Sequence, residues 1–74
     1  MSRERAEVLA VLLAGLSRAQ VARESWMRLG SYLLSVSTEV PGIQGLVTDV
    51  QRAEALTEAV ERRLSEVVGG YDLH

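Results

Sequence analysis

The side chains best suited to metal chemistry are four glutamates in the second half of the chain, Glu54, Glu58, Glu61 and Glu66. Paired helices that bind two metal ions also place a His three residues after a Glu. The only His is His74, the last residue, and it follows no such glutamate. We therefore expect these carboxylates to form a solvated helix face, and we expect no metal and no cofactor.

Nucleophilic or phosphate chemistry has equally little support. A catalytic serine requires a base within hydrogen-bond reach, and His74 at the end of the chain is poorly placed to supply one. Gly42-Ile-Gln-Gly45 lacks both the Lys and the full spacing of a phosphate-binding loop. We expect the protein not to be an enzyme and to have no small-molecule substrate.

Length and composition indicate association. A chain of 74 residues has a small core, which rarely supplies more than about 3–5 kcal/mol of stability. Such proteins are usually reinforced by disulfides, a metal or a partner, and this chain contains no Cys. The remaining option is a partner, so we expect a homo-oligomer (a dimer) or a hetero-oligomer with another helical protein.

The elements that would form this surface are two helical arms separated by Pro41-Gly42. Leu, Ala and Val supply most of the apolar residues, which favours helix over sheet. In the first arm a 3-4 spacing connects Val8, Leu12, Gly15, Ala19, Ala22, Trp26, Leu29, Leu33, Val36 and Val40. In the second arm the same spacing connects Ile43, Leu46, Val50, Ala53, Thr57, Val60, Leu64, Val67 and Tyr71. The pattern predicts an all-α helical hairpin of two long amphipathic helices.

Two capping boxes offer alternative helix boundaries. Ser17 with Gln20, preceded by Gly15, favours a break near residues 15–17 and so three helices, whereas the uninterrupted stripe favours one continuous helix. We prefer the continuous helix. Thr48 with Gln51 predicts a regular helix starting near Asp49 and ending at Gly69-Gly70. The predicted organisation is a single helical domain, residues 1–74, with arm one at 2–37, a hinge at 38–47, arm two at 48–68 and a tail at 69–74.

A short segment, Leu13 to Glu24, resembles the first helix of a helix-turn-helix DNA reader. The resemblance fails at the next positions, because Ser25 falls on an apolar site and Trp26 falls on the tight turn that normally uses Gly. The net charge of −2 also disfavours nucleic acid. A small DNA-binding regulator or antitoxin-like protein with a degenerate helix-turn-helix is therefore the alternative function.

The location is expected to be cytoplasmic. Glu4 and Glu7 stand where a signal peptide would be basic, and the apolar run from Val8 to Leu16 is too short to cross a bilayer. A membrane-surface helix is also disfavoured, because the arginines do not gather beside one apolar face.

The favoured function is a non-enzymatic protein-protein interaction module, a small structural or adaptor subunit. Several apolar residues lie outside both stripes, among them Leu34 and Leu56, so one hairpin cannot cover them all. We expect two hairpins to pair into a four-helix bundle, or one hairpin to dock on a helical partner. The predicted interface residues are Leu12, Ala19, Ala22, Trp26, Leu29, Leu33, Val50, Val60, Leu64 and Val67.

Overall fold

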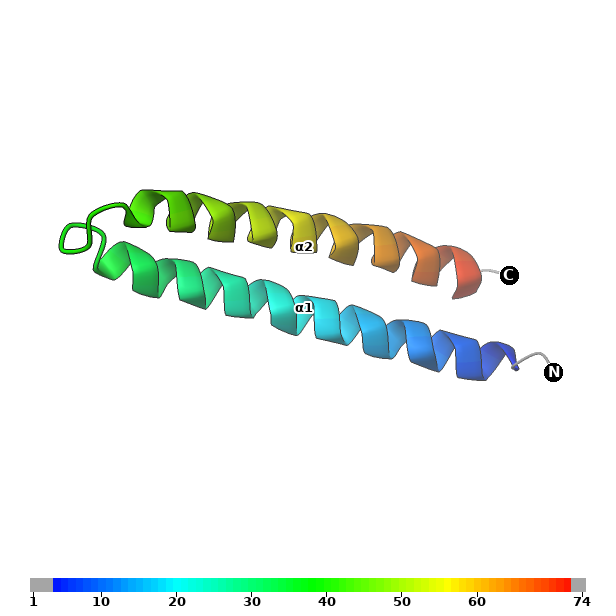
Figure 1. Cartoon of the computed structure of the whole chain (residues 1–74). Coiled ribbons are helices and arrows are strands. Elements are labelled where there is room, and N and C mark those ends of the chain that lie inside the picture. Colours follow the sequence, from blue (N-terminus) through cyan, green and yellow to red (C-terminus); the bar gives the residue numbers. More distant parts are fainter. Residues whose placement is uncertain (1–3, 73–74) are drawn as a thin grey trace.

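The computed structural model describes residues 4–72 and consists of two helices, α1 (Arg5–Ser35) and α2 (Ile43–Asp72). The helices run antiparallel and side by side, with the turn at one end and both chain ends at the other (Figure 1). No strand occurs within the described range. The prediction of an all-α helical hairpin is confirmed.

The hairpin is long and thin. Its principal extents are 55 × 18 × 14 Å and its radius of gyration is 17.0 Å, against about 11 Å for a compact domain of this length. The accessible surface is 5729 Å². A compact monomer of 8.1 kDa exposes about 4,500 Å², so the hairpin leaves an excess of roughly 1,200 Å² in water.

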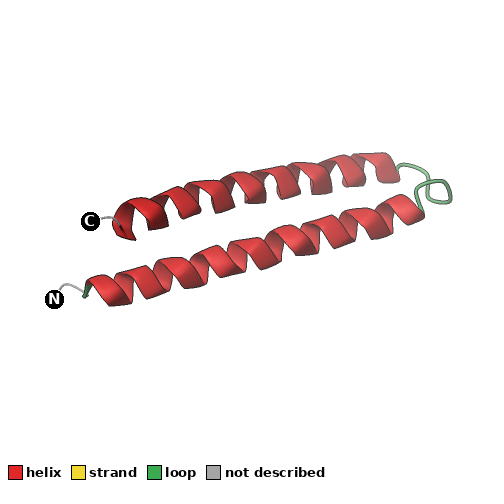
Figure 2. Ribbon diagram, turned by 180° about the vertical axis from the view of Figure 1, so that it is seen from behind, coloured by secondary structure: helices red, strands yellow, loops and turns green. Residues whose placement is uncertain are grey.

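The reversal of the chain is a tight turn at Pro41-Gly42. The Ile43 amide donates to the Val40 carbonyl at 3.4 Å, and Gly42 has φ 81°. This is the pattern of a type II β-turn, which takes Pro at its second position and needs Gly at its third. The segment between the helices, residues 36–42, is the green loop of Figure 2.

Helix α1 is continuous through the expected break at 15–17. Ser17 and Gln20 lie inside it, so the Ser17 capping box is not used. Gly15 is also helical, and a Cβ there would stand 3.6 Å from Leu64 Cδ2, an ordinary packing distance. The helix ends at Ser35, two residues before the predicted end of arm one, and predicted residues 2–3 of that arm lie outside the described range.

Helix α2 is longer than predicted at both ends. It begins at Ile43, within the predicted hinge, because Ile43, Val47 and Val50 supply the buried apolar side chains of the hairpin. Burial of these residues outweighs the start signal at Thr48. Among the described residues the only other buried one is Gly30 of α1, where a Cβ would lie 3.7 Å from Val50 Cγ1.

At its far end α2 continues through Gly69-Gly70, where the sequence predicted a stop. Each helical glycine costs about 1 kcal/mol relative to alanine. Tyr71 follows Gly70 directly and is half-buried, with the Arg5 guanidinium carbon 5.3 Å from its ring centroid. This cation–π contact joins the open end of the hairpin and favours the last turn. Residues 73–74 of the predicted tail, including His74, lie outside the described range.

Candidate interaction surface

The surface of the hairpin depends on which residues the two helices turn toward each other. Gly15 lies against Leu64, and Gly30 lies against Val50. These two contacts fix an antiparallel register in which each step along α1 is matched by a step back along α2. We call the line of contact between α1 and α2 the seam.

On α1 the predicted stripe follows the seam for only part of its length. Val8, Gly15 and Ala22, seven residues apart, are half-buried, but the next two members of the series, Leu29 and Val36, are each 40% exposed. A strict seven-residue repeat drifts by about 20° per heptad around a straight helix. After three heptads, at Leu29, the series has therefore rotated away from α2, and Gly30 takes the inward position. In the segment that follows α1, Ser37 is half-buried and Val36 is exposed, which corrects the predicted stripe.

On α2 one half of the predicted stripe lies on the seam, whereas the large members of the other half do not. The inward half is the series Ile43, Val50, Thr57, Leu64 and Tyr71. The other predicted members were Leu46, Ala53, Val60 and Val67, and the three large ones are 51%, 50% and 53% exposed. Their places on the seam are taken by Val47, Glu54, Glu61 and Val68.

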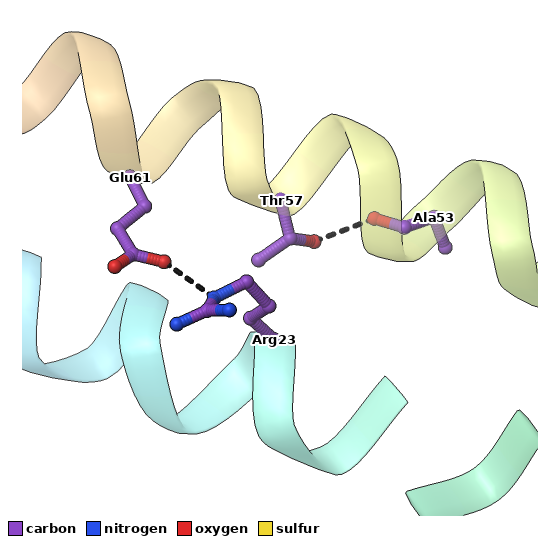
Figure 3. A network of polar contacts seen from close by, with 4 residues as sticks. All are labelled: Arg23, Ala53, Thr57 and Glu61. Carbon is purple, nitrogen blue, oxygen red and sulfur yellow. Dashed lines mark hydrogen bonds and ion pairs between the residues drawn. The ribbon is translucent and has the colours of Figure 1, made fainter. Parts of the chain in front are cut away.

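Two glutamates thus occupy seam positions, and Glu61 has a partner on the other helix. The Arg23 Nε donates to Glu61 Oε2 at 2.7 Å, with 33% and 18% of the two side chains exposed, and the two side chains point toward each other in Figure 3. Partial exposure limits the pair to about 1 kcal/mol or less. Thr57, also on the seam, donates from Oγ1 to the Ala53 carbonyl at 2.7 Å (Figure 3).

The ion pair lies in a polar groove along one side of the seam. The groove is lined by Leu16, Gln20, Arg23, Glu58, Glu61, Arg62, Ser65 and Glu66. Three of the four glutamates considered as metal ligands line it, and two arginines interrupt them. Among the described residues no group of three or more His, Cys, Asp or Glu side chains is arranged to hold a metal ion.

The opposite side of α2 carries a second line of residues at 3-4 spacing, which we call the outer stripe. It consists of Leu46, Asp49, Ala53, Leu56, Val60, Arg63 and Val67. Its most exposed apolar member is Leu56, at 67%, and the remaining large ones are each about half exposed. A shallow apolar hollow lies between Val60, Arg63, Leu64 and Val67.

Helix α1 contributes to the same side of the hairpin. A second shallow hollow is lined by Ala22, Ser25, Trp26 and Leu29. At about 100° per residue these positions lie on the flank of α1 opposite Arg23, just as Val60 and Val67 lie on the flank of α2 opposite Glu61. The outer stripe and the α1 hollow together form what we call the apolar face, with the polar groove on the other side.

The predicted interface residues divide between the seam and the apolar face. Those that line the seam within one chain are Leu12, Ala19, Ala22, Trp26, Leu33, Val50 and Leu64, and those that remain exposed are Leu29, Val60 and Val67. Ala22 and Trp26 belong to both, because they line the α1 hollow.

The prediction missed Asp49, Leu56 and Arg63 as members of a surface line. They belong to a second series at 3-4 spacing, which the sequence also contains. That series continues from Leu46 to Asp49, whereas the predicted series continues from Leu46 to Val50. Neither described helix is both long and apolar enough to cross a membrane. No protein-family model, curated protein or solved structure matches this chain.

Proposed function

We propose that this protein is a non-enzymatic helical interaction module that buries its apolar face against another helical surface, as a small structural or adaptor subunit. The observation that carries the proposal is how α2 distributes its side chains. Its apolar series Leu46, Val60 and Val67 faces water, while Glu54 and Glu61 take the equivalent places against α1. An isolated hairpin would be more stable with the reverse arrangement, in which the apolar series packs against α1 and the glutamates face water.

The dimensions of the hairpin agree with this proposal. A standard interface buries about 800 Å² on each partner, which is roughly one seventh of the 5729 Å² that the hairpin exposes. The buried apolar residues are Ile43, Val47 and Val50, all close to the turn. Covering the apolar face would extend the core along the whole hairpin, as in a four-helix bundle.

The alternative of a DNA-binding regulator gains no support from the fold. Residues 13–24, which resemble the first helix of a helix-turn-helix, lie within the uninterrupted α1, as do Ser25 and Trp26 where the motif would turn. That motif requires two helices at a steep angle joined by a short turn.

The proposal is tested by sedimentation and light scattering at micromolar concentration, with thermal unfolding followed over a hundredfold range of concentration. We expect a mass above the 8.1 kDa of one chain and a melting temperature that rises with concentration. Val60→Glu, on the outer stripe, should lower both. Ala55→Glu, at an exposed α2 position outside seam and stripe, is the matched control. A cooperatively folded monomer whose stability is independent of concentration would contradict the proposal.

A further inference from the structure

The outer stripe of α2 is arranged almost symmetrically about its middle residue, Leu56. Asp49 lies seven residues before Leu56 and Arg63 lies seven residues after it. Ala53 and Val60 stand three and four residues away on either side, and Leu46 and Val67 stand ten and eleven away. The two charged members of the stripe therefore have opposite signs at equal distances from its centre.

We infer that the occupant of the apolar face is a second copy of this chain, docked with the two α2 helices antiparallel about a two-fold axis at Leu56. This inference rests on the proposed function and names its partner. In this arrangement Asp49 of each copy lies within one helical turn of Arg63 of the other, twice by symmetry. A parallel pairing would instead put Asp49 on Asp49 and Arg63 on Arg63, which like charges oppose.

The charges concerned are free to pair between copies. The only ion pair that Asp49 forms within the described residues is with Arg52, one turn away at 3.8 Å, with 71% and 78% of the two side chains exposed. Such a contact contributes little. Exchanging it for a contact with a second copy costs correspondingly little.

Helix α1 is compatible with the same centre. An antiparallel contact between two α1 helices places the large Trp26 ring opposite the small Ala22 of the other copy when the axis passes at Glu24, midway between them. The register that sets Gly15 against Leu64 and Gly30 against Val50 brings Glu24 level with Leu56. A single two-fold axis is therefore compatible with contacts between both pairs of helices. The Trp26 ring of one copy would enter the α1 hollow of the other copy, which Ala22 and Trp26 line.

The test is a charge-swap cycle with dimerisation measured by sedimentation at low salt. Arg63→Asp alone and Asp49→Arg alone should each weaken the dimer about tenfold, because each replaces two attractions by two repulsions. The double variant D49R/R63D should return to within about threefold of the original affinity. Arg28→Asp, an exposed α1 position with the same change of charge, is the control and should not weaken the dimer.

The orientation is measured separately with a spin label on Gln44→Cys, since the chain has no Cys of its own. Antiparallel copies centred at Leu56 place the two labels about 35 Å apart, whereas parallel copies place them under about 20 Å apart. A dimer with the short distance, or one that the double variant fails to restore, overturns this inference and leaves the interaction module standing. A chain that is unfolded alone also overturns it, because a second copy then does not suffice. A monomer that unfolds cooperatively, with a stability independent of concentration, contradicts both this inference and the proposed function.

Discussion

At the scale of single residues, Gly42 sets the reversal of the chain. Its φ of 81° lies in the left-handed region, where a Cβ collides with the backbone of an L-residue. Apart from Gly42 and its two neighbours in the chain, no atom of the described residues lies within 4 Å of the place a Cβ would take, so the constraint comes from the backbone conformation and not from packing. Gly45, three residues on, also has open space around its Cβ position but lies inside α2.

These two glycines should respond to alanine in opposite directions. Gly42→Ala should lower the free energy of unfolding by about 1 kcal/mol, because the left-handed conformation costs roughly 1–2 kcal/mol and the loss of unfolded-state entropy recovers part of it. Gly45→Ala should raise it by about 0.5–1 kcal/mol through helix propensity. Urea unfolding at one fixed protein concentration measures both. A stabilising Gly42→Ala would mean that the turn is not left-handed there.

At the scale of the helices, the number and direction of the elements could be predicted, because Pro41-Gly42 and two long stripes are local signals. The phase of the stripes, meaning which side of each helix packs against the other helix, could not be predicted. On α2, the series containing Val50 and Leu64 is flanked on one side by Val60 and on the other by Glu61. Hydrophobicity alone selects Val60 for the seam, whereas the structure selects Glu61.

The reason lies in a contact between distant parts of the chain. Glu61 is tolerated on the seam because its Oε2 lies 2.7 Å from Nε of Arg23 on α1. This ion pair forms only in the register that the two helices adopt. The outer stripe was missed for a related reason. Asp49 and Arg63 are charged, so hydrophobicity alone does not place them in a series with Leu56 and Val60. Their symmetry about Leu56 becomes meaningful only once α2 is known to turn this side to water.

The helix boundaries can be tested by removing the two capping boxes. Ser17 and Thr48 lie inside helices, so Ser17→Ala and Thr48→Ala should leave stability unchanged or raise it by up to about 0.7 kcal/mol. A true N-cap would instead lose about 1 kcal/mol. Ser31→Ala is a suitable control, because Ser31 is an exposed serine inside α1 whose hydroxyl donates to the Met27 carbonyl at 3.2 Å. Loss of a full kilocalorie at Ser17 alone would indicate a helix break there.

At the scale of the whole molecule, the hairpin has two unlike sides. One carries the polar groove, whose lining includes two arginines and three glutamates, and the other carries the apolar face. The elongated shape makes both sides large relative to the volume enclosed, as the radius of gyration of 17.0 Å indicates. A molecule of this shape offers much more surface for contact than interior for a site, which agrees with an interaction role.

The same distribution of charge leads to an expectation about nucleic acid. Duplex DNA is bound chiefly by neutralising its phosphates, which requires a basic patch or stripe. Here ten acidic residues outweigh eight arginines, and the arginines at positions 23 and 62 share their groove with three glutamates. We therefore expect no saturable binding when the protein is titrated into a fluorescently labelled duplex at low salt and its anisotropy is followed. Saturable binding whose affinity falls steeply as salt is added would favour the DNA-binding regulator. The slope of the logarithm of affinity against the logarithm of salt concentration reflects the number of phosphates that the protein neutralises.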